Sequence, residues 1–169
     1  MLEIRKATED DKPQVWEIIK SVIATGDTYP FYPNSPKEKM LDFWFADDKK
    51  TYVAVVSEPP ASAGGQKIVG TFFLKDNQID LGSHIVNAGY MVAPEAKGKR
   101  VGRTMAEFSL EEARTFGYRA MQFNFVVKSN EVAVRLWQKL GFEIIGEIPE
   151  AFQHKENGLT NALIMYRKL

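Results

Sequence analysis

The residues best suited to chemistry lie in one short segment, "VAPEAKGKRVGRT", over positions 92–104. This segment holds four cations, Lys97, Lys99, Arg100 and Arg103, with Gly98 and Gly102 between them. Glycine lets a backbone approach a phosphate closely, and a helix N-terminus presents unpaired N–H groups with a partial positive charge. The pattern therefore indicates a turn that binds a pyrophosphate between a strand and a helix. For this segment taken alone, a solvated loop whose cations only favour solubility is the alternative.

The rest of the composition makes this cationic segment a local feature. The 169 residues include 22 Lys and Arg against 22 Asp and Glu, so the formal net charge is zero. A neutral chain is not typical of proteins that coat nucleic acid or acidic membranes, and no apolar run has the length of a membrane span. With no cysteine and two histidines, we expect no metal site. The charged start "MLEIRKATEDD" predicts no signal peptide, and we expect a cytoplasmic protein.

The elements that must position this segment follow from hydrophobic periodicity and turn residues. Helices are predicted over 8–23, 36–45, 101–116 and 131–140, and strands over 2–8, 51–57, 67–75, 84–92, 118–127, 142–148 and 160–169. The connections over 58–66 and 149–159 are expected to be a hairpin tip and a loop. This order predicts one mixed α/β domain over residues 1–169.

A second segment, "NEVAVRLWQKLGF" over 130–142, follows the fifth predicted strand. Together the two segments resemble motifs A and B of the GNAT superfamily of acetyl-CoA-dependent N-acetyltransferases. Motif A of that family reads V-x-P-x-x-R-G-K-G-x-G-R, and motif B reads N-x-x-A-x-x-L-Y-x-x-x-G-F. The resemblance extends over the whole chain in element order. It implies a central, mostly antiparallel sheet of about seven strands, a splayed pair formed by strands 84–92 and 118–127, and about four flanking helices.

The resemblance also implies how acetyl-CoA, the co-substrate, would be held. Backbone amides from Gly98 to Arg103 would bind the pyrophosphate, the main chain of Met91 and Val92 would pair with the pantetheine arm, and Asn130 would bond to that arm. The expected coenzyme contacts are Met91, Val92, Lys97, Gly98, Lys99, Arg100, Val101, Gly102, Arg103 and Asn130. The Val92 N–H would polarise the thioester carbonyl. A plain helix cap is the alternative for Asn130.

Two residues depart from the family's pattern. Arg100 stands where glycine is usual, and we expect a helical φ there, which tolerates arginine. Trp137 stands where the family often has a tyrosine proposed to protonate the departing thiolate, and an indole N–H does not release a proton near neutral pH. The chain then uses another acid, for which Tyr90 and Tyr166 are candidates, or none, because a thiol with a pKa of about 8.5 is a fair leaving group. Trp137 itself fits a core aromatic.

Two asparagines inside apolar strands, Asn87 and Asn124, indicate the acceptor side. Asparagine is unfavourable in strands and costly to bury without partners. In the GNAT fold both strands border the cleft, so the two amides would bind the acceptor; bonding across the sheet is the alternative. With Tyr90, this pattern resembles the branch that acetylates proline analogues such as azetidine-2-carboxylate. We therefore expect Val92, Asn87, Asn124 and Tyr90 to form the catalytic centre.

The segments 25–33 and 148–158 are expected to wall the acceptor pocket, with Tyr29 among the apolar contacts and His154, Glu147 or Glu150 as candidate bases. The predicted activity is direct attack of a small-molecule amine on acetyl-CoA. The alternatives are a protein or peptide N-acetyltransferase and a catalytically silent CoA-binding module. The sequence leaves a homodimer open.

Overall fold

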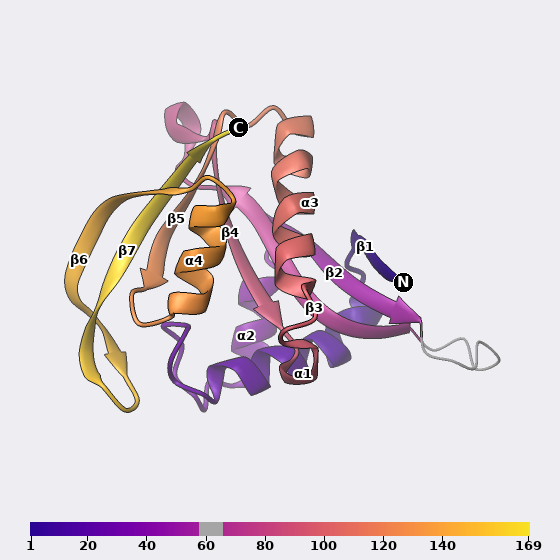
Figure 1. Cartoon of the computed structure of the whole chain (residues 1–169). Helices are drawn as coiled ribbons and strands as arrows, with labels where there is room; N and C mark the ends of the chain where they lie inside the picture. The colour runs from indigo at the N-terminus through magenta and orange to yellow at the C-terminus, as the bar shows by residue number, and fades with distance from the viewer. Residues whose placement is uncertain (58–65) are drawn as a thin grey trace.

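The computed structural model describes residues 1–57 and 66–169 (Figure 1). One seven-stranded sheet runs through the molecule in the order β1-β2-β3-β4-β5-β7-β6. The strands are β1 (Leu2–Lys6), β2 (Lys49–Ser57), β3 (Gln66–Asp76), β4 (Ile85–Val92), β5 (Ala120–Val127), β6 (Glu143–His154) and β7 (Gly158–Lys168). The α-helices are α1 (Lys12–Ile23), α2 (Lys37–Trp44), α3 (Val101–Thr115) and α4 (Glu131–Lys139). The predicted mixed α/β class, the seven strands and the four helices are confirmed. No helix in the described part of the chain is long and apolar enough to cross a membrane.

Helices cover both faces of the sheet, as the side chains of β3 show. Thr71 and Phe73 face α2, where Trp44 donates its indole N–H to Thr71 Oγ1 at 2.9 Å and packs edge-on against Phe73. Gly70 faces α3, and a Cβ at this glycine would lie 2.8 Å from Met105 Sδ. Because successive strand residues point to opposite faces, the two helix layers enclose two halves of the core.

The pair β4 and β5 lies at the centre of the sheet and diverges along its length. β4 pairs with β3 over its whole length, antiparallel, but it pairs with β5 in parallel at Ile85–Ala120 and Val86–Met121 only. Figure 1 shows the two arrows pointing the same way and moving apart. The predicted splayed pair is therefore confirmed.

The structure corrects the predicted loop over 149–159. β6 and β7 form one long hairpin that reaches His154 and Gly158, with register shifts between Ile144 and Gly146 and between Ile148 and Phe152. Pro149 has no N–H for the ladder, and the second shift lets pairing resume beyond it, where Phe152 is buried. Residues 58–65 of the predicted hairpin tip lie outside the described residues. The flanking strands β2 and β3 pair antiparallel.

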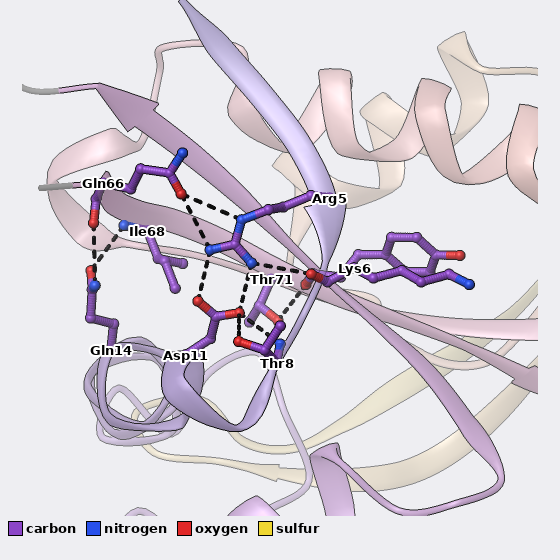
Figure 2. Close-up of polar contacts among 9 residues, drawn as sticks. Arg5, Lys6, Thr8, Asp11, Gln14, Gln66, Ile68 and Thr71 are labelled. Carbon is purple, nitrogen blue, oxygen red and sulfur yellow. Dashed lines mark hydrogen bonds and ion pairs between the residues drawn. The ribbon is translucent and has the colours of Figure 1, made fainter. Parts of the chain in front are cut away.

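A polar network ties β1 to the start of α1 (Figure 2). Arg5 donates from both terminal nitrogens to the Asp11 carboxylate, at 2.7 and 2.8 Å. Asp11, which is 6% exposed, also accepts from the Thr8 backbone N–H at 2.7 Å. The bond from Arg5 holds the pKa of the Asp11 carboxyl below its ordinary value of 3.8.

Replacing Asp11 by asparagine is expected to lower the free energy of unfolding by about 1–2 kcal/mol, because half-buried Arg5 loses its charged partner. A carboxyl group whose pKa is lower in the folded than in the unfolded protein stabilises the fold fully at a pH above its unfolded pKa. This stabilisation is lost as the pH falls through its folded pKa. The difference between parent and variant should therefore shrink as the pH falls below 3.8 and vanish only below the lower pKa that Asp11 has in the folded protein. Urea denaturation at pH 7 and pH 3 measures it. The control Glu9→Gln, in an exposed pair with Lys12, should cost under about 0.5 kcal/mol.

Candidate active site

The turn between β4 and α3 presents a row of backbone N–H groups without partners. A 3-10 turn over Pro94–Ala96 leads out of β4, and α3 begins at Val101. Lys97 and Lys99 donate their N–H groups to Pro94 and Ala96, and the helix ladder begins with Thr104 donating to Arg100. Five backbone N–H groups of this turn have no acceptor among the described residues, namely those of Gly98, Arg100, Val101, Gly102 and Arg103. Such a row at a helix start can bind an anion.

The backbone of this turn is left-handed at two positions. Gly98 has a φ of 79°, which glycine adopts without cost. Arg100 has a φ of 64°, so the expected helical φ at this residue is wrong. The reason is that Arg100 is the N-cap of α3 and turns the chain before the helix starts. A side chain in this region costs about 1–2 kcal/mol, so Arg100 is strained where the family's glycine would not be.

The cations around this turn are exposed, as an anion site requires. Within the described chain, no ion pair involves Lys97, Lys99 or Arg100, whereas Arg103 pairs with Glu107 at 2.8 Å. Gly102 lies against Val92, whose Cγ2 would be 3.5 Å from an added Cβ. The turn and the end of β4 therefore form one continuous surface.

The free edge of β4 faces the gap between the splayed strands. Asn77 N–H donates to Ile85 O at 2.8 Å and Ala93 N–H donates to Val69 O at 2.9 Å, at the two ends of one unbroken register. In an antiparallel ladder, residues bonded to the neighbour alternate with residues whose groups point away. The odd-numbered residues 85–93 thus bond to β3, and Ala88, Tyr90 and Val92 direct their N–H and C=O groups toward β5. The pairing of β4 with β5 ends at Val86, so the backbone N–H and C=O groups of these three residues line the gap.

This register changes one expectation about the coenzyme. Met91 pairs with Thr71 and its backbone groups belong to the β3 ladder, so they are not free to pair with a pantetheine arm. Val92 has the orientation that the expected contact needs. Its side chain is half-buried against Gly102, next to the unpaired amides of α3.

Helix α4 borders the same gap from the α3 side. Asn130 caps this helix, with its Oδ1 accepting from Ala133 N–H at 3.3 Å, and its amide NH₂ has no partner among the described residues. Capping therefore uses the Oδ1 of Asn130 and leaves its NH₂ available as a donor. Trp137 is 8% exposed, and its ring lies 4.6 Å from Phe123 and 5.0 Å from Tyr90 between centroids. Trp137 thus packs as a core aromatic.

Both predicted asparagines lie on the α1–α2 face, in a cluster of side-chain amides. Asn87 donates to the Gln122 carbonyl at 2.9 Å, at the point where β4 and β5 part. Gln122 donates to Asn124 Oδ1 at 2.9 Å, and Asn124 donates to Asn77 Oδ1 at 2.6 Å. Bonding across the sheet, the alternative reading, therefore occurs. The Asn87 Oδ1 and its second N–H remain unbonded in the described structure, so the amide can still meet a ligand.

The Tyr90 side chain points away from these asparagines, toward α3. Its hydroxyl lies 2.6 Å from Ser109 Oγ, and Ser109 in turn donates to Ala106 O at 2.7 Å. Tyr90 therefore donates to Ser109. Burial raises the pKa of the Tyr90 hydroxyl, so this group is a poor acid toward a thiolate.

The two segments expected to wall the pocket do meet. Lys155 N–H, at the tip of the β6–β7 hairpin, donates to Gly26 O in the connection after α1 at 3.1 Å. His154 Nδ1 accepts from the backbone N–H groups of Glu156 and Asn157, both at 3.1 Å, so this nitrogen is not free to take a proton from an amine. Glu147 bonds to Lys128 at 2.5 Å, which lowers the pKa of its carboxyl and makes it a weaker base.

Sequence reasoning missed two members of the site, Gln122 and Asn77, and expected only an apolar contact from Tyr29. Gln122 and Asn77 complete the amide cluster, and the hydroxyl of Tyr29 donates to Tyr90 O at 2.9 Å. Gln122 had a signal, because it lies two residues before Asn124 and so shares its face. Nothing local marks the contact of Tyr29, whose partner is 61 residues away. In the described residues, no group of three or more His, Asp or Glu side chains could hold a metal ion.

A free strand edge that ends in a row of unpaired N–H groups is the arrangement of a class of proteins that can bind an extended ligand with a phosphate group at one end. The family model of the acetyltransferase (GNAT) family matches residues 12–142. The chain is 31% identical over 151 residues to N-acetyltransferase aca1 of Schizosaccharomyces pombe, covering 84% of this chain and 72% of that one. This chain therefore belongs to the GNAT family of acetyltransferases.

Solved structures show the same fold. A GCN5-related N-acetyltransferase from Kribbella flavida superposes with a TM-score of 0.89 and 35% identity, over 99% of this chain and 98% of that one. YncA of Salmonella typhimurium, described as an acetyltransferase with its cofactor acetyl-CoA, gives a TM-score of 0.83 at 21% identity, over 100% and 94%. At 21% identity, the similarity to YncA shows only that the two proteins share a fold.

Proposed function

We propose that this chain transfers the acetyl group of acetyl-CoA to the amine of a small molecule. The observation that carries the proposal is the row of unpaired N–H groups at the start of α3, continuous with the free edge of β4. The pyrophosphate would lie on these N–H groups beside Lys97, Lys99 and Arg100. The pantetheine arm would add to the edge of β4 at Val92, and the Asn130 NH₂ would donate to it.

Catalysis follows from position and from one hydrogen-bond donor. The amine nitrogen attacks the thioester carbon, a C–N bond forms, and the C–S electron pair leaves with the CoA thiolate. The Val92 N–H, which faces the gap, would stabilise the negative charge that develops on the carbonyl oxygen. The extra proton of the amine would pass to water or to Glu150, since the other two candidate bases, His154 and Glu147, are bonded elsewhere.

The acceptor is proposed to be a small, carboxylated amine of the proline-analogue kind. Support comes from the amide cluster on the acceptor face and from the contact of Lys155 with Gly26, which brings the two walls together. A panel of amines that contains azetidine-2-carboxylate, proline, other amino acids and short peptides tests this, with release of free CoA thiol as the readout. Preference for peptides would identify a peptide N-acetyltransferase. Binding of acetyl-CoA without amine-dependent thiol release would identify a silent module. A cytoplasmic location is part of the proposal.

Replacing Asn130 by serine should separate its two tasks. Serine is a good N-cap and keeps the bond to Ala133 N–H, so the melting temperature should stay within about 2 °C. It lacks the amide NH₂, so affinity for acetyl-CoA should fall about five- to tenfold, the value of one hydrogen bond. Calorimetry with acetyl-CoA measures the affinity. Unchanged affinity at unchanged stability would reduce Asn130 to a helix cap.

A further inference from the structure

The hydroxyl of Tyr29 lies at the free edge of β4, on the face where the acceptor is proposed to bind. It donates to Tyr90 O at 2.9 Å, and this carbonyl is one of the groups that β4 directs into the gap. The hydroxyl is also close to the backbone of Gly89, where an added Cβ would lie 3.2 Å from it. The contact therefore places a polar atom from the connection after α1 two residues away from Val92.

Aromatic packing fixes the ring of Tyr29. It stacks on Phe31 with centroids 6.0 Å apart and meets Trp44 edge-on at 6.2 Å. Trp44 is itself held, because its indole N–H donates to Thr71 and Thr71 donates to Tyr52 O at 2.8 Å. The hydroxyl can therefore keep one position relative to β4, as a group that orients a substrate must.

The chemistry of this hydroxyl is restricted. Its single proton is given to the Tyr90 carbonyl, so toward a ligand it offers only lone pairs and can only accept. Burial raises the pKa of the Tyr29 hydroxyl, which keeps it protonated and makes it a poor proton donor to a thiolate whose conjugate acid has a pKa of about 8.5. An acceptor amine, in contrast, has an N–H that needs a partner when its lone pair faces the thioester carbon.

We propose that Tyr29 Oη accepts a hydrogen bond from the N–H of the acceptor amine and so directs the amine lone pair toward the thioester carbon beside the Val92 amide. This inference rests on the proposed function and adds to it a substrate-positioning residue. The absence of a side chain at Gly89 leaves room for this hydroxyl, since an added Cβ would lie 3.2 Å from it and 2.7 Å from Phe73. Acceptors are then restricted to primary and secondary amines, which retain an N–H in the neutral form.

The test compares Tyr29→Phe with Tyr52→Phe, using azetidine-2-carboxylate and the best other amine of the panel. Tyr52 in β2 donates its hydroxyl to Glu112 of α3 at 2.7 Å, so its variant also loses one hydroxyl hydrogen bond but should keep the kinetics of the parent. Tyr29→Phe keeps the ring packing, and we expect kcat for the amine to fall about tenfold or more with KM changed less than threefold. Affinity for acetyl-CoA should not change.

The outcomes separate the two proposals. A fall in kcat with a steady KM, and an unshifted pH profile between pH 6 and 9, supports positioning by a hydroxyl that stays protonated. A higher KM with a normal kcat would mean that Tyr29 only anchors its loop, and kcat within twofold of the parent would also overturn the inference, in both cases leaving the proposed function intact. If the parent protein turns over no amine of the panel, the proposed function fails and the inference fails with it.

Discussion

A Gly102→Asp variant is expected to lose affinity for acetyl-CoA by about 100-fold or more while its fold remains at least as stable as the parent. Gly102 lies in the first turn of α3 and its N–H is one of the unpaired donors. An aspartate there places a carboxylate where the pyrophosphate would bind, so the anion site is occupied and its charge is cancelled. The same carboxylate favours the helix by about 0.3–1 kcal/mol, because it lies near the positive end of the helix dipole.

The Gly102→Ala variant is the matched control, because it adds the Cβ without the charge. That Cβ would lie 3.5 Å from Val92 Cγ2, an ordinary contact, so the fold should accept it. Calorimetry with acetyl-CoA and thermal unfolding should be measured on both variants. Binding by the aspartate variant within fivefold of the alanine variant would mean that the coenzyme does not use this helix start.

The second large effect is expected at Asn87. An Asn87→Ala variant should lose about 100-fold in kcat/KM for the acceptor, the scale of removing one well-placed polar group from an active site, with little change in affinity for acetyl-CoA. It also loses the bond to the Gln122 carbonyl, so a destabilisation of about 1 kcal/mol should accompany the kinetic effect. Steady-state kinetics of thiol release, with the amine varied at saturating acetyl-CoA, measure it.

Asn87→Asp distinguishes the classes of acceptor. Aspartate keeps an oxygen acceptor, loses the NH₂ and adds a negative charge. For a carboxylated acceptor this variant should be worse than alanine, because like charges repel; for an amine without an acidic group it should be better. Normal acceptor kinetics in both variants would remove Asn87 from the site and leave it only the role of joining β4 to β5.

Local sequence signals predicted the parts of the site that depend on neighbouring residues. The two glycines and four cations of 92–104 indicated an anion-binding helix start, and the unpaired N–H groups are there. The cap, which was the alternative to a pantetheine contact for Asn130, is also present. The element order and the divergence of the strands 84–92 and 118–127 also agree with the family resemblance. The turn and the cap are carried by a few consecutive residues, which backbone geometry relates directly, whereas the divergence of the two strands was expected from the family resemblance alone.

Other parts of the site could not be predicted in this way. The left-handed backbone of Arg100 reverses a local expectation, because the path of the chain from β4 into α3 overrides the preference of the side chain. The register of β3 against β4 decides that Val92 and not Met91 has free backbone groups, and a shift by one residue would exchange them. The long β6–β7 hairpin depends on pairing that resumes beyond Pro149, which no single strand reveals.

The sequence by itself determined the family, the turn with unpaired N–H groups before α3 and the order of helices and strands, because these reside in periodicity and in short motifs. Only the tertiary structure decided what faces the gap between β4 and β5. Asn87 meets the Gln122 carbonyl across 35 positions and Tyr29 meets the Tyr90 carbonyl across 61. Contacts at such separations form only when the whole sheet is assembled and the connection after α1 is packed against it, so no local pattern encodes them.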